Sequence, residues 1–374
     1  MRRVILSCVL VVALLSLGAV AYSAEPIKIG FDLAMTGGVA AYGQMAWEGA
    51  NLIKELVKPE VLGRPVEFVL VDNKSDKVEA ANAASRLIEK EEAVAIIGPM
   101  ISGSMLATGE ICEKRQVPII GPTTTNPLTT LGRKYVFRAC YTDPFQAAIA
   151  AKFAYEELGA RTAAILSDIS QDYCVALGGF FQGSFEKLGG KVVSLTFCKL
   201  GDQDFSAQLT TIKKANPDII YLPNYYNEVA LTMRQMRDLG LKQPVLSADG
   251  IDVPELFTVG GSAVEGIMHT AFWHEKAGMT DIGKKYIAAY KQKYAGKEVN
   301  SFGALTADCY LIILDAIKRA GSTDPKKVRD AIEATKNLPV VTGPVTIENG
   351  DAIKPVVIRQ AKGGKWEFKA IINP

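Results

Sequence analysis

Hydroxyl, phenol and carboxyl side chains follow several of the short apolar runs in this chain. The positions concerned are Ser102, the segment 123–127, Tyr173, Tyr225 and Asp249. Each of them alone is more often a cap or turn residue. Together they are more informative, because hydroxyls and unpaired N–H groups at a helix start suit a carboxylate, and a lone carboxylate suits an ammonium. With tyrosines as walls, the set predicts a site for a zwitterion.

Three other chemistries find little support in the residues. The segment 98–104 lacks the lysine of a phosphate loop, and the glycine pair 37–38 lacks the third glycine of a dinucleotide fingerprint. His269 and His274 are the only histidines, there is no G-x-S-x-G elbow, and no two cysteines form a C-x-x-C pair. We therefore expect no enzyme activity, no cofactor and no metal.

The elements that must position these residues alternate regularly. Short apolar runs between amphipathic helical patterns predict α/β lobes with doubly wound parallel sheets, whose ligands bind at the carboxyl ends of the strands. A seam at 138–143 divides the series into two halves. The predicted strands are 27–33, 66–71, 94–97, 117–120, 163–166, 192–196, 219–222, 245–247, 345–347, 356–359 and 366–371. The predicted helices are 46–57, 77–90, 104–115, 145–158, 175–188, 205–215, 228–239, 281–294 and 302–320, with another beginning at Asp324 and Pro325.

The N-terminus carries the pattern of an export signal. Arg2 and Arg3 precede an apolar run at 4–17, and small residues at 19–21 or at Ala24 offer cleavage sites; a retained N-terminal anchor is the alternative. Without the two arginines, the 42 basic residues fall to 40, equal to the 40 acidic ones. Such a balance argues against nucleic acid as a partner. Five cysteines remain, an odd number that leaves at least one unpaired, and we expect buried thiols.

Several longer motifs carry a family resemblance. The most specific are the segments 28–44, 98–103, 125–127, 135–138, 201–206, 216–221, 234–241, 321–324 and 341–343. In these segments the chain resembles the periplasmic branched-chain amino acid-binding proteins of ABC transporters, which are type I solute-binding proteins. The resemblance covers essentially the whole mature chain.

The resemblance implies a type I periplasmic-binding-protein fold of two Rossmann-like lobes joined by three hinge crossings. It implies a signal peptide at 1–24, a first lobe at 25–142 plus 273–349, and a second lobe at 143–272 plus 350–374. It further implies a monomer in the periplasm, or outside the cytoplasm in other envelopes. This monomer would close on an amino acid and deliver it to an ABC permease in the inner membrane.

Site roles follow by the same resemblance. Ser102 and Thr125 would bind the ligand carboxylate with help from the Thr123 backbone, and Asp249 would bind the ammonium. Tyr42 would belong to the first-lobe wall, and Tyr173 and Tyr225 to the closing surface of the second lobe.

The chain departs from the family pattern at several pocket positions. Asp249 stands where leucine/isoleucine/valine binders have Glu, Cys174 replaces a glycine, and Thr123 and Thr124 replace alanines. The disulfide of the best-known members is missing, because Ser75 and Ile101 occupy its positions. Polar amino acids, short amides and aromatic acids therefore stay open as ligands. A sensor module for amides or other small carboxylates, feeding a receptor or kinase, and an exported α/β enzyme are the rival functions.

Overall fold

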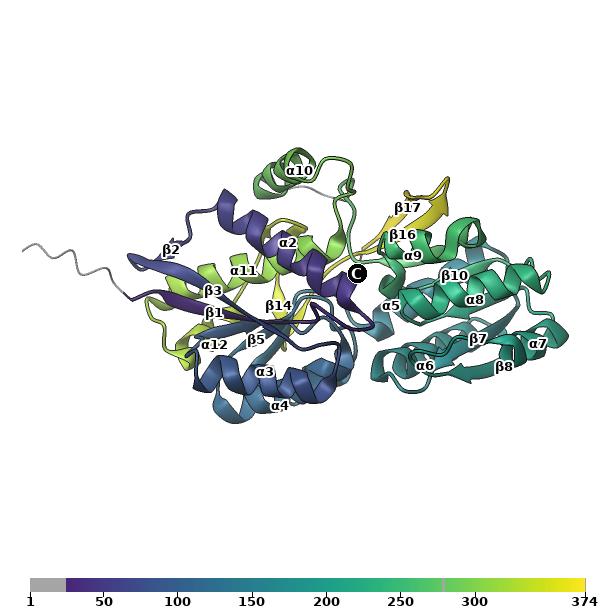
Figure 1. The fold of residues 1–374 in the computed structure, drawn as a ribbon, viewed down its shortest axis with the longest axis horizontal. Helices are drawn as coiled ribbons and strands as arrows, with labels where there is room; N and C mark the ends of the chain where they lie inside the picture. The colour runs from purple at the N-terminus through teal and green to yellow at the C-terminus, as the bar shows by residue number, and fades with distance from the viewer. Residues whose placement is uncertain (1–24, 278–279, 374) are drawn as a thin grey trace, which may run out of the picture.

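The computed structural model describes residues 25–277 and 280–373. The signal-peptide prediction falls on residues 1–24 and lies outside the described residues. Within the described part, the large strands form two sheets in two lobes that lie side by side (Figure 1). No helix of this part is both long and apolar enough to span a membrane.

The sheet of the first lobe is mainly parallel. Across the sheet its strands are β2 (Glu60–Val61), β3 (Arg64–Asp72), β1 (Ile27–Leu33), β4 (Ala95–Ile97), β5 (Ile119–Gly121) and β6 (Val136–Arg138). The helices that accompany it are α2 (Ala40–Leu56), α3 (Lys77–Glu89), α4 (Ser102–Arg115), α10 (Asp281–Lys293), α11 (Ser301–Ala320) and α12 (Pro325–Glu333). Every residue of β4 and β5 is buried, as expected for short apolar strands covered on both faces.

The second lobe repeats the arrangement and adds an antiparallel hairpin. Across the sheet its strands are β17 (Lys365–Ile372), β16 (Val356–Lys362), β11 (Met268–Ala271), β10 (Val245–Ser247), β9 (Ile219–Leu222), β7 (Thr162–Asp168) and β8 (Lys191–Cys198). Its helices are α5 (Asp143–Lys152), α6 (Asp172–Lys187), α7 (Ser206–Ala215), α8 (Tyr226–Asp238) and α9 (Glu255–Gly260). Short helical segments lie at Pro127–Thr129, Phe153–Glu157, Asp249–Ile251 and Gly261–Val264.

Two small hairpins complete the structure near the third passage of the chain between the lobes. They are β12 (Leu338–Val340) with β13 (Gly343–Val345), and β14 (Ile347–Glu348) with β15 (Asp351–Ala352). Asp351 accepts a hydrogen bond at 2.7 Å from Arg138 of β6, and Lys354 lies 3.2 Å from Asp308 of α11. Both contacts are to the first lobe. The division of the chain at 142, 272 and 349 stays a proposal, and these ion pairs argue for extending the first lobe to residue 354.

The close approach of α2 and α11 brings distant parts of the first lobe together. A Cβ added at Gly49 of α2 would collide with the backbone of Gly303 in α11, so the contact requires glycine. At the cleft end of the same helix pair, the rings of Tyr42 and Phe302 stack with centroids 4.6 Å apart. Asn300 begins α11 as its N-cap and accepts a hydrogen bond from Gly303 N at 2.6 Å. The fold thus delivers an aromatic pair to the cleft from segments 260 residues apart.

The strand and helix predictions hold for most elements. Strands β9 and β10 have the predicted bounds, and the Asp324 side chain caps α12 by accepting from Lys327 N at 3.0 Å. Strands β2, β6, β11, β12 and β15 were not predicted, because each contains a charged, polar or proline residue that interrupts the apolar pattern. The five predicted buried thiols, at Cys112, Cys140, Cys174, Cys198 and Cys309, are all buried.

Candidate ligand-binding site

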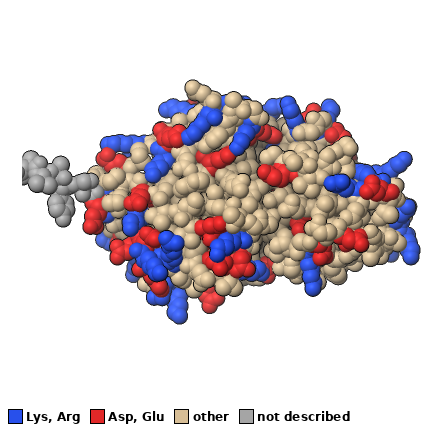
Figure 2. Space-filling model, viewed as in Figure 1, with Lys and Arg blue, Asp and Glu red and all other residues tan. Residues whose placement is uncertain are grey.

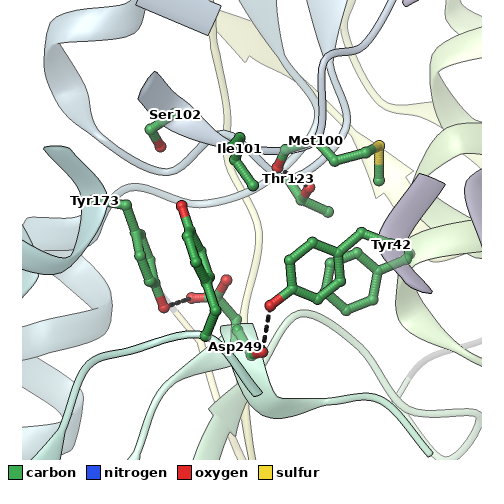
Figure 3. A pocket seen from close by; sticks show the side chains of 10 residues that line it. Tyr42, Met100, Ile101, Ser102, Thr123, Tyr173 and Asp249 are labelled. Carbon is green, nitrogen blue, oxygen red and sulfur yellow. Dashed lines mark hydrogen bonds between the residues drawn. The ribbon is translucent and has the colours of Figure 1, made fainter. Parts of the chain in front are cut away.

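A small cavity lies between the lobes at the carboxyl ends of the strands. The space between the atoms at this place, counted together with open solvent, is about 230 Å³. The lining residues are Tyr42, Met100, Ile101, Ser102, Thr123, Tyr173, Tyr225, Asp249, Gly250 and Phe302. In Figure 3, Ser102, Ile101 and Thr123 lie along one side and Asp249 along the opposite side, with Tyr173 and Tyr42 on the flanks.

The first-lobe side of the cavity offers hydrogen-bonding groups for an anion. Ser102 is the first residue of α4, so free backbone N–H groups of the helix start lie beside its hydroxyl. The Ser102 Oγ accepts from Asn126 N at 3.2 Å, which fixes the loop after β5 against the helix. The Thr123 hydroxyl donates to Met100 O at 2.6 Å. Its donor is therefore used within the first lobe.

Aromatic rings form the flanks of the cavity. Tyr173 and Tyr225 of the second lobe stack nearly parallel, with centroids 5.5 Å apart. Tyr42 meets Tyr225 edge-on at 5.9 Å, so the two lobes share one aromatic wall. Such edge-to-face pairs are favourable beyond their buried area.

Asp249 supplies the carboxylate of the site. It is 4% exposed and accepts a hydrogen bond from the Tyr173 hydroxyl at 3.0 Å (Figure 3). Burial, together with the nearby Asp143 carboxyl, raises the pKa of Asp249 to about 8. The described part of the chain places no Lys or Arg in an ion pair with Asp249. Its environment therefore favours a cation supplied from outside.

Asp143 is a second buried carboxyl near this site. It begins α5 and donates its backbone N–H to Thr125 O at 2.9 Å. Burial raises the pKa of Asp143 to about 7, against the attraction of Arg138. Its Oδ2 has no hydrogen-bond partner among the described residues. Asp143 does not line the cavity, so it acts on the site through its charge.

Direct contacts hold the two lobes together around the cavity. The Tyr42 hydroxyl donates to Gly250 O at 2.5 Å, and the Tyr226 hydroxyl donates to Gly38 O at 3.2 Å. At the rim, Lys77 Nζ lies 2.5 Å from the Asp172 carboxylate. All three contacts join the first lobe to the second, so the structure has the lobes closed on the cavity.

The structure brings together six of the seven predicted site residues. Tyr42, Ser102, Thr123, Tyr173, Tyr225 and Asp249 line the cavity. Thr125 does not line it: Thr125 is fully buried, and its hydroxyl lies near Asp143 without a hydrogen bond to any described residue. The ligand contacts assigned to all seven residues stay predictions.

Sequence reasoning missed four lining residues, Met100, Ile101, Gly250 and Phe302. Met100 and Ile101 directly precede Ser102 and could have been found as neighbours of a predicted site residue. Phe302 gave no local signal, because it is one apolar residue at the start of a long buried helix. Only the packing of α11 on α2 brings it to the cleft.

Among the described residues, the geometry supports neither a metal site nor a surface patch of one charge sign. In residues 25–277 and 280–373, no three His, Cys, Asp or Glu side chains gather as metal ligands. Figure 2 shows Lys and Arg interspersed with Asp and Glu over both lobes on the visible face. Near the cleft, the Thr125 hydroxyl, the Asp143 Oδ2 and the Tyr225 hydroxyl are buried without a hydrogen-bond partner among the described residues.

Comparison with known proteins connects this site to a family. A periplasmic binding protein family model matches residues 26–365. A curated relative is the leucine-, isoleucine-, valine-, threonine- and alanine-binding protein of Pseudomonas aeruginosa, 30% identical over 326 residues, which are 85% of each chain.

Two solved structures are also similar. The leucine binding protein LivK of Thermotoga maritima is 48% identical, with a TM-score of 0.91 over 93% of this chain and 99% of that one. The LivJ substrate binding protein of Streptococcus pneumoniae, solved with isoleucine, is 29% identical, with a TM-score of 0.88 over 93% of this chain and all of that one. The predicted two-lobe fold and the predicted class, a solute-binding protein rather than an enzyme, are confirmed. The chain belongs to the periplasmic binding protein family.

Proposed function

We propose that this protein captures an amino acid with an aliphatic side chain in the periplasm and delivers it to an ABC permease. The observation that carries the proposal is that one small cavity has hydrogen-bond donors on one side and a carboxyl group on the other. A helix start with a serine lies on one side and the buried carboxyl of Asp249 on the other. An α-amino acid carries the complementary pair of charges.

The first lobe would hold the carboxylate. Ser102 offers a hydroxyl and, with the next residues of α4, free backbone N–H groups. Thr125 would add its unpaired hydroxyl after a small adjustment of the loop at 123–126. These groups donate hydrogen bonds without carrying a positive charge, so they suit a single small anion.

The second lobe would hold the ammonium. Asp249 accepts from Tyr173, which orients the carboxyl toward the cavity. An ammonium beside Asp249 would offset the cost of burying its charge. Tyr173 and Tyr225 would then cover the ligand from the side of the second lobe.

The remaining wall favours an apolar side chain. Tyr42 and Phe302 stack against each other, and Met100 lies beside them in the lining. The sequence alone favoured a more polar pocket because of Thr123. In the structure the Thr123 hydroxyl donates to Met100 O, so this donor is not free for a ligand. The LivK relative is a leucine binding protein, and the LivJ relative was solved in complex with isoleucine; both support the same ligand class.

Closure would couple binding to delivery. The interlobe contacts at Tyr42, Lys77 and Tyr226 exist only when the lobes meet. A ligand that touches both walls stabilises this form by its difference in affinity between closed and open states. A membrane permease could then distinguish loaded protein from empty protein by shape.

A thermal-shift panel on ligand-stripped protein tests the proposal. The panel contains L-leucine, L-isoleucine, L-valine, L-alanine, L-threonine, L-asparagine and benzoate, with Asp249→Ala as the matched control. A ligand present at 100 times its Kd stabilises the protein by about 2.7 kcal/mol. We expect shifts with the aliphatic amino acids that the variant loses. A shift with benzoate and none with any amino acid would refute the proposal.

A further inference from the structure

The inference concerns Asp252, a buried carboxylate of the second lobe that contacts the first lobe. Asp252 directly follows the short helical segment Asp249–Ile251, which carries two residues of the cavity lining. Its Oδ1 accepts a hydrogen bond at 2.6 Å from Arg359 Nη1, on β16 of the same lobe, and its Oδ2 accepts one at 2.9 Å from the Ser301 hydroxyl. Ser301 is the first residue of α11, so Asp252 connects a strand of one lobe with a helix start of the other.

The same arginine makes a second contact between the lobes. Arg359 forms an ion pair through Nη2 with Glu298, which lies just before α11. The neighbouring Lys297 has its Nζ 2.6 Å from Glu48 Oε1 of α2, so this segment belongs to the first lobe. The Arg359 side chain is buried and the Glu298 side chain is half-exposed. One buried guanidinium therefore binds an acid of its own lobe and an acid of the other lobe.

The charges of this cluster are compensated when the lobes meet. Asp252 and Glu298 oppose their two negative charges to the single positive charge of Arg359. His269 Nε2 lies 3.8 Å from Asp252 Oδ1, but burial lowers the pKa of His269 to about 4, so the ring is neutral near pH 7. The remaining negative charge lies at the start of α11, a helix of 20 residues whose first N–H groups and dipole favour an anion. Separating the lobes would remove this helix start from Asp252 and one carboxylate from Arg359.

We propose that this cluster is an interlobe latch that stabilises the closed form whether or not a ligand is bound. Its members are Asp252, Glu298, Ser301 and Arg359. Asp252 N donates to Asp249 O at 3.0 Å, and Ser301 directly precedes Phe302, so the two joined elements carry residues of both cavity walls. The proposal rests on the lobe closure of the proposed function, but not on the identity of the ligand. Loss of the latch should lower the affinity of every ligand by the same factor, because it acts on the closing equilibrium.

A cross-linking rate measures closure without any ligand. Lys77 and Asp172 are partly exposed and form an ion pair across the rim of the cleft, with Nζ 2.5 Å from Oδ2. Lys77→Cys with Asp172→Cys, in ligand-stripped protein, gives two thiols that a short bismaleimide bridges when the lobes are closed. The five cysteines of the described residues are buried and compete little for the reagent. The bridging rate therefore follows the closed fraction.

Latch variants and matched controls are compared in this double-cysteine protein. Ser301→Ala should slow bridging about tenfold, because it removes a hydrogen bond to a buried charged group. Glu298→Gln should slow it about 1.4- to 5-fold, as expected for a half-exposed ion pair. The controls are Ser85→Ala, whose hydroxyl bonds within α3, and Glu89→Gln, whose half-exposed carboxylate pairs with Arg115 inside the first lobe. Both controls should leave the rate unchanged.

Calorimetry on the same substitutions in the protein with native cysteines gives a second readout. Each latch variant should lower the affinities for L-leucine and L-valine by one common factor. Bridging rates equal to wild type in both latch variants would overturn the inference, as would losses that differ more than threefold between the two ligands. If Ser301→Ala fails to fold, Glu298→Gln, at a half-exposed position, decides alone. Wild-type protein that bound neither amino acid would refute the proposed function, whereas slower bridging in the latch variants would still support the latch.

Discussion

Replacing Asp249 tests whether its carboxylate binds the ammonium group of the ligand. Asp249→Asn keeps the size and the contact with Tyr173 but removes the negative charge, and Asp249→Ala removes the side chain. Because Asp249 is 4% exposed, its partner on the ligand would be almost fully desolvated. Truncating one member of such a buried charged pair costs about 2–5 kcal/mol. We therefore expect amino-acid affinity to fall by about one and a half to four factors of ten.

The pH dependence of amino-acid affinity gives a second, independent test of the role of Asp249. Burial raises the pKa of Asp249 to about 8, so at pH 7 the empty site holds the acid mainly protonated. Ammonium binding requires the anion, and one pKa unit corresponds to about 1.4 kcal/mol. Wild-type affinity should therefore rise about tenfold from pH 7 to above pH 8. Asp249→Asn should lose most of this rise.

Isothermal titration calorimetry with L-leucine at pH 6.5, 7.5 and 8.5 measures both effects. The protein is first unfolded and refolded to strip bound ligand. A loss below threefold in both variants, or a pH profile in Asp249→Asn that parallels wild type, would show that Asp249 does not bind the ammonium.

Three further predictions concern the frame around the site. Gly49→Ala should lower the free energy of unfolding by about 1–3 kcal/mol in urea titrations, because a methyl group there collides with the backbone of α11; Gly179→Ala, in open space on α6, should not destabilise the protein. Lys77→Met should weaken ligand binding about 1.4- to 5-fold at low salt, because the half-exposed pair with Asp172 forms only on closure, and the difference from wild type should vanish in 1 M NaCl. Burial raises the pKa of Asp32 to about 7, above its unfolded value near 4, so its protonated form favours the folded state. Its contribution to stability is therefore lost as the pH rises from about 4 to 7, and Asp32→Asn should flatten that part of the stability profile measured by urea unfolding at pH 5, 6 and 7.

Most strands of the two sheets could be predicted, because buried parallel strands appear in the sequence as short apolar runs. Strands β9 and β10 are buried throughout, and their predicted bounds are those of the structure. Strand β6 escaped prediction because its three residues, Val136–Arg138, include a fully buried arginine. A charged residue interrupts the apolar run by which a buried strand is recognised. In the structure, the ion pair with Asp351 compensates the buried charge of Arg138, but the sequence does not reveal this pair.

The residues of the site also fall into two groups, those that the sequence predicts and those that it does not. Ser102 and Asp249 lie shortly after the ends of β4 and β10, so topology predicts their place at the cleft. Phe302 depends on tertiary packing. It reaches the cavity through the glycine contact of α2 with α11. No spacing in the sequence encodes this contact.

The central claim is that the cavity binds an amino acid with its carboxylate on the first lobe and its ammonium on the second. A crystal structure of the protein with L-leucine tests this claim most directly. We predict carboxylate oxygens within hydrogen-bonding distance of Ser102 and Thr125, and the ammonium nitrogen within hydrogen-bonding distance of the Asp249 carboxylate. A ligand bound in the reverse orientation, or outside the cavity between Tyr42 and Tyr173, would contradict the claim.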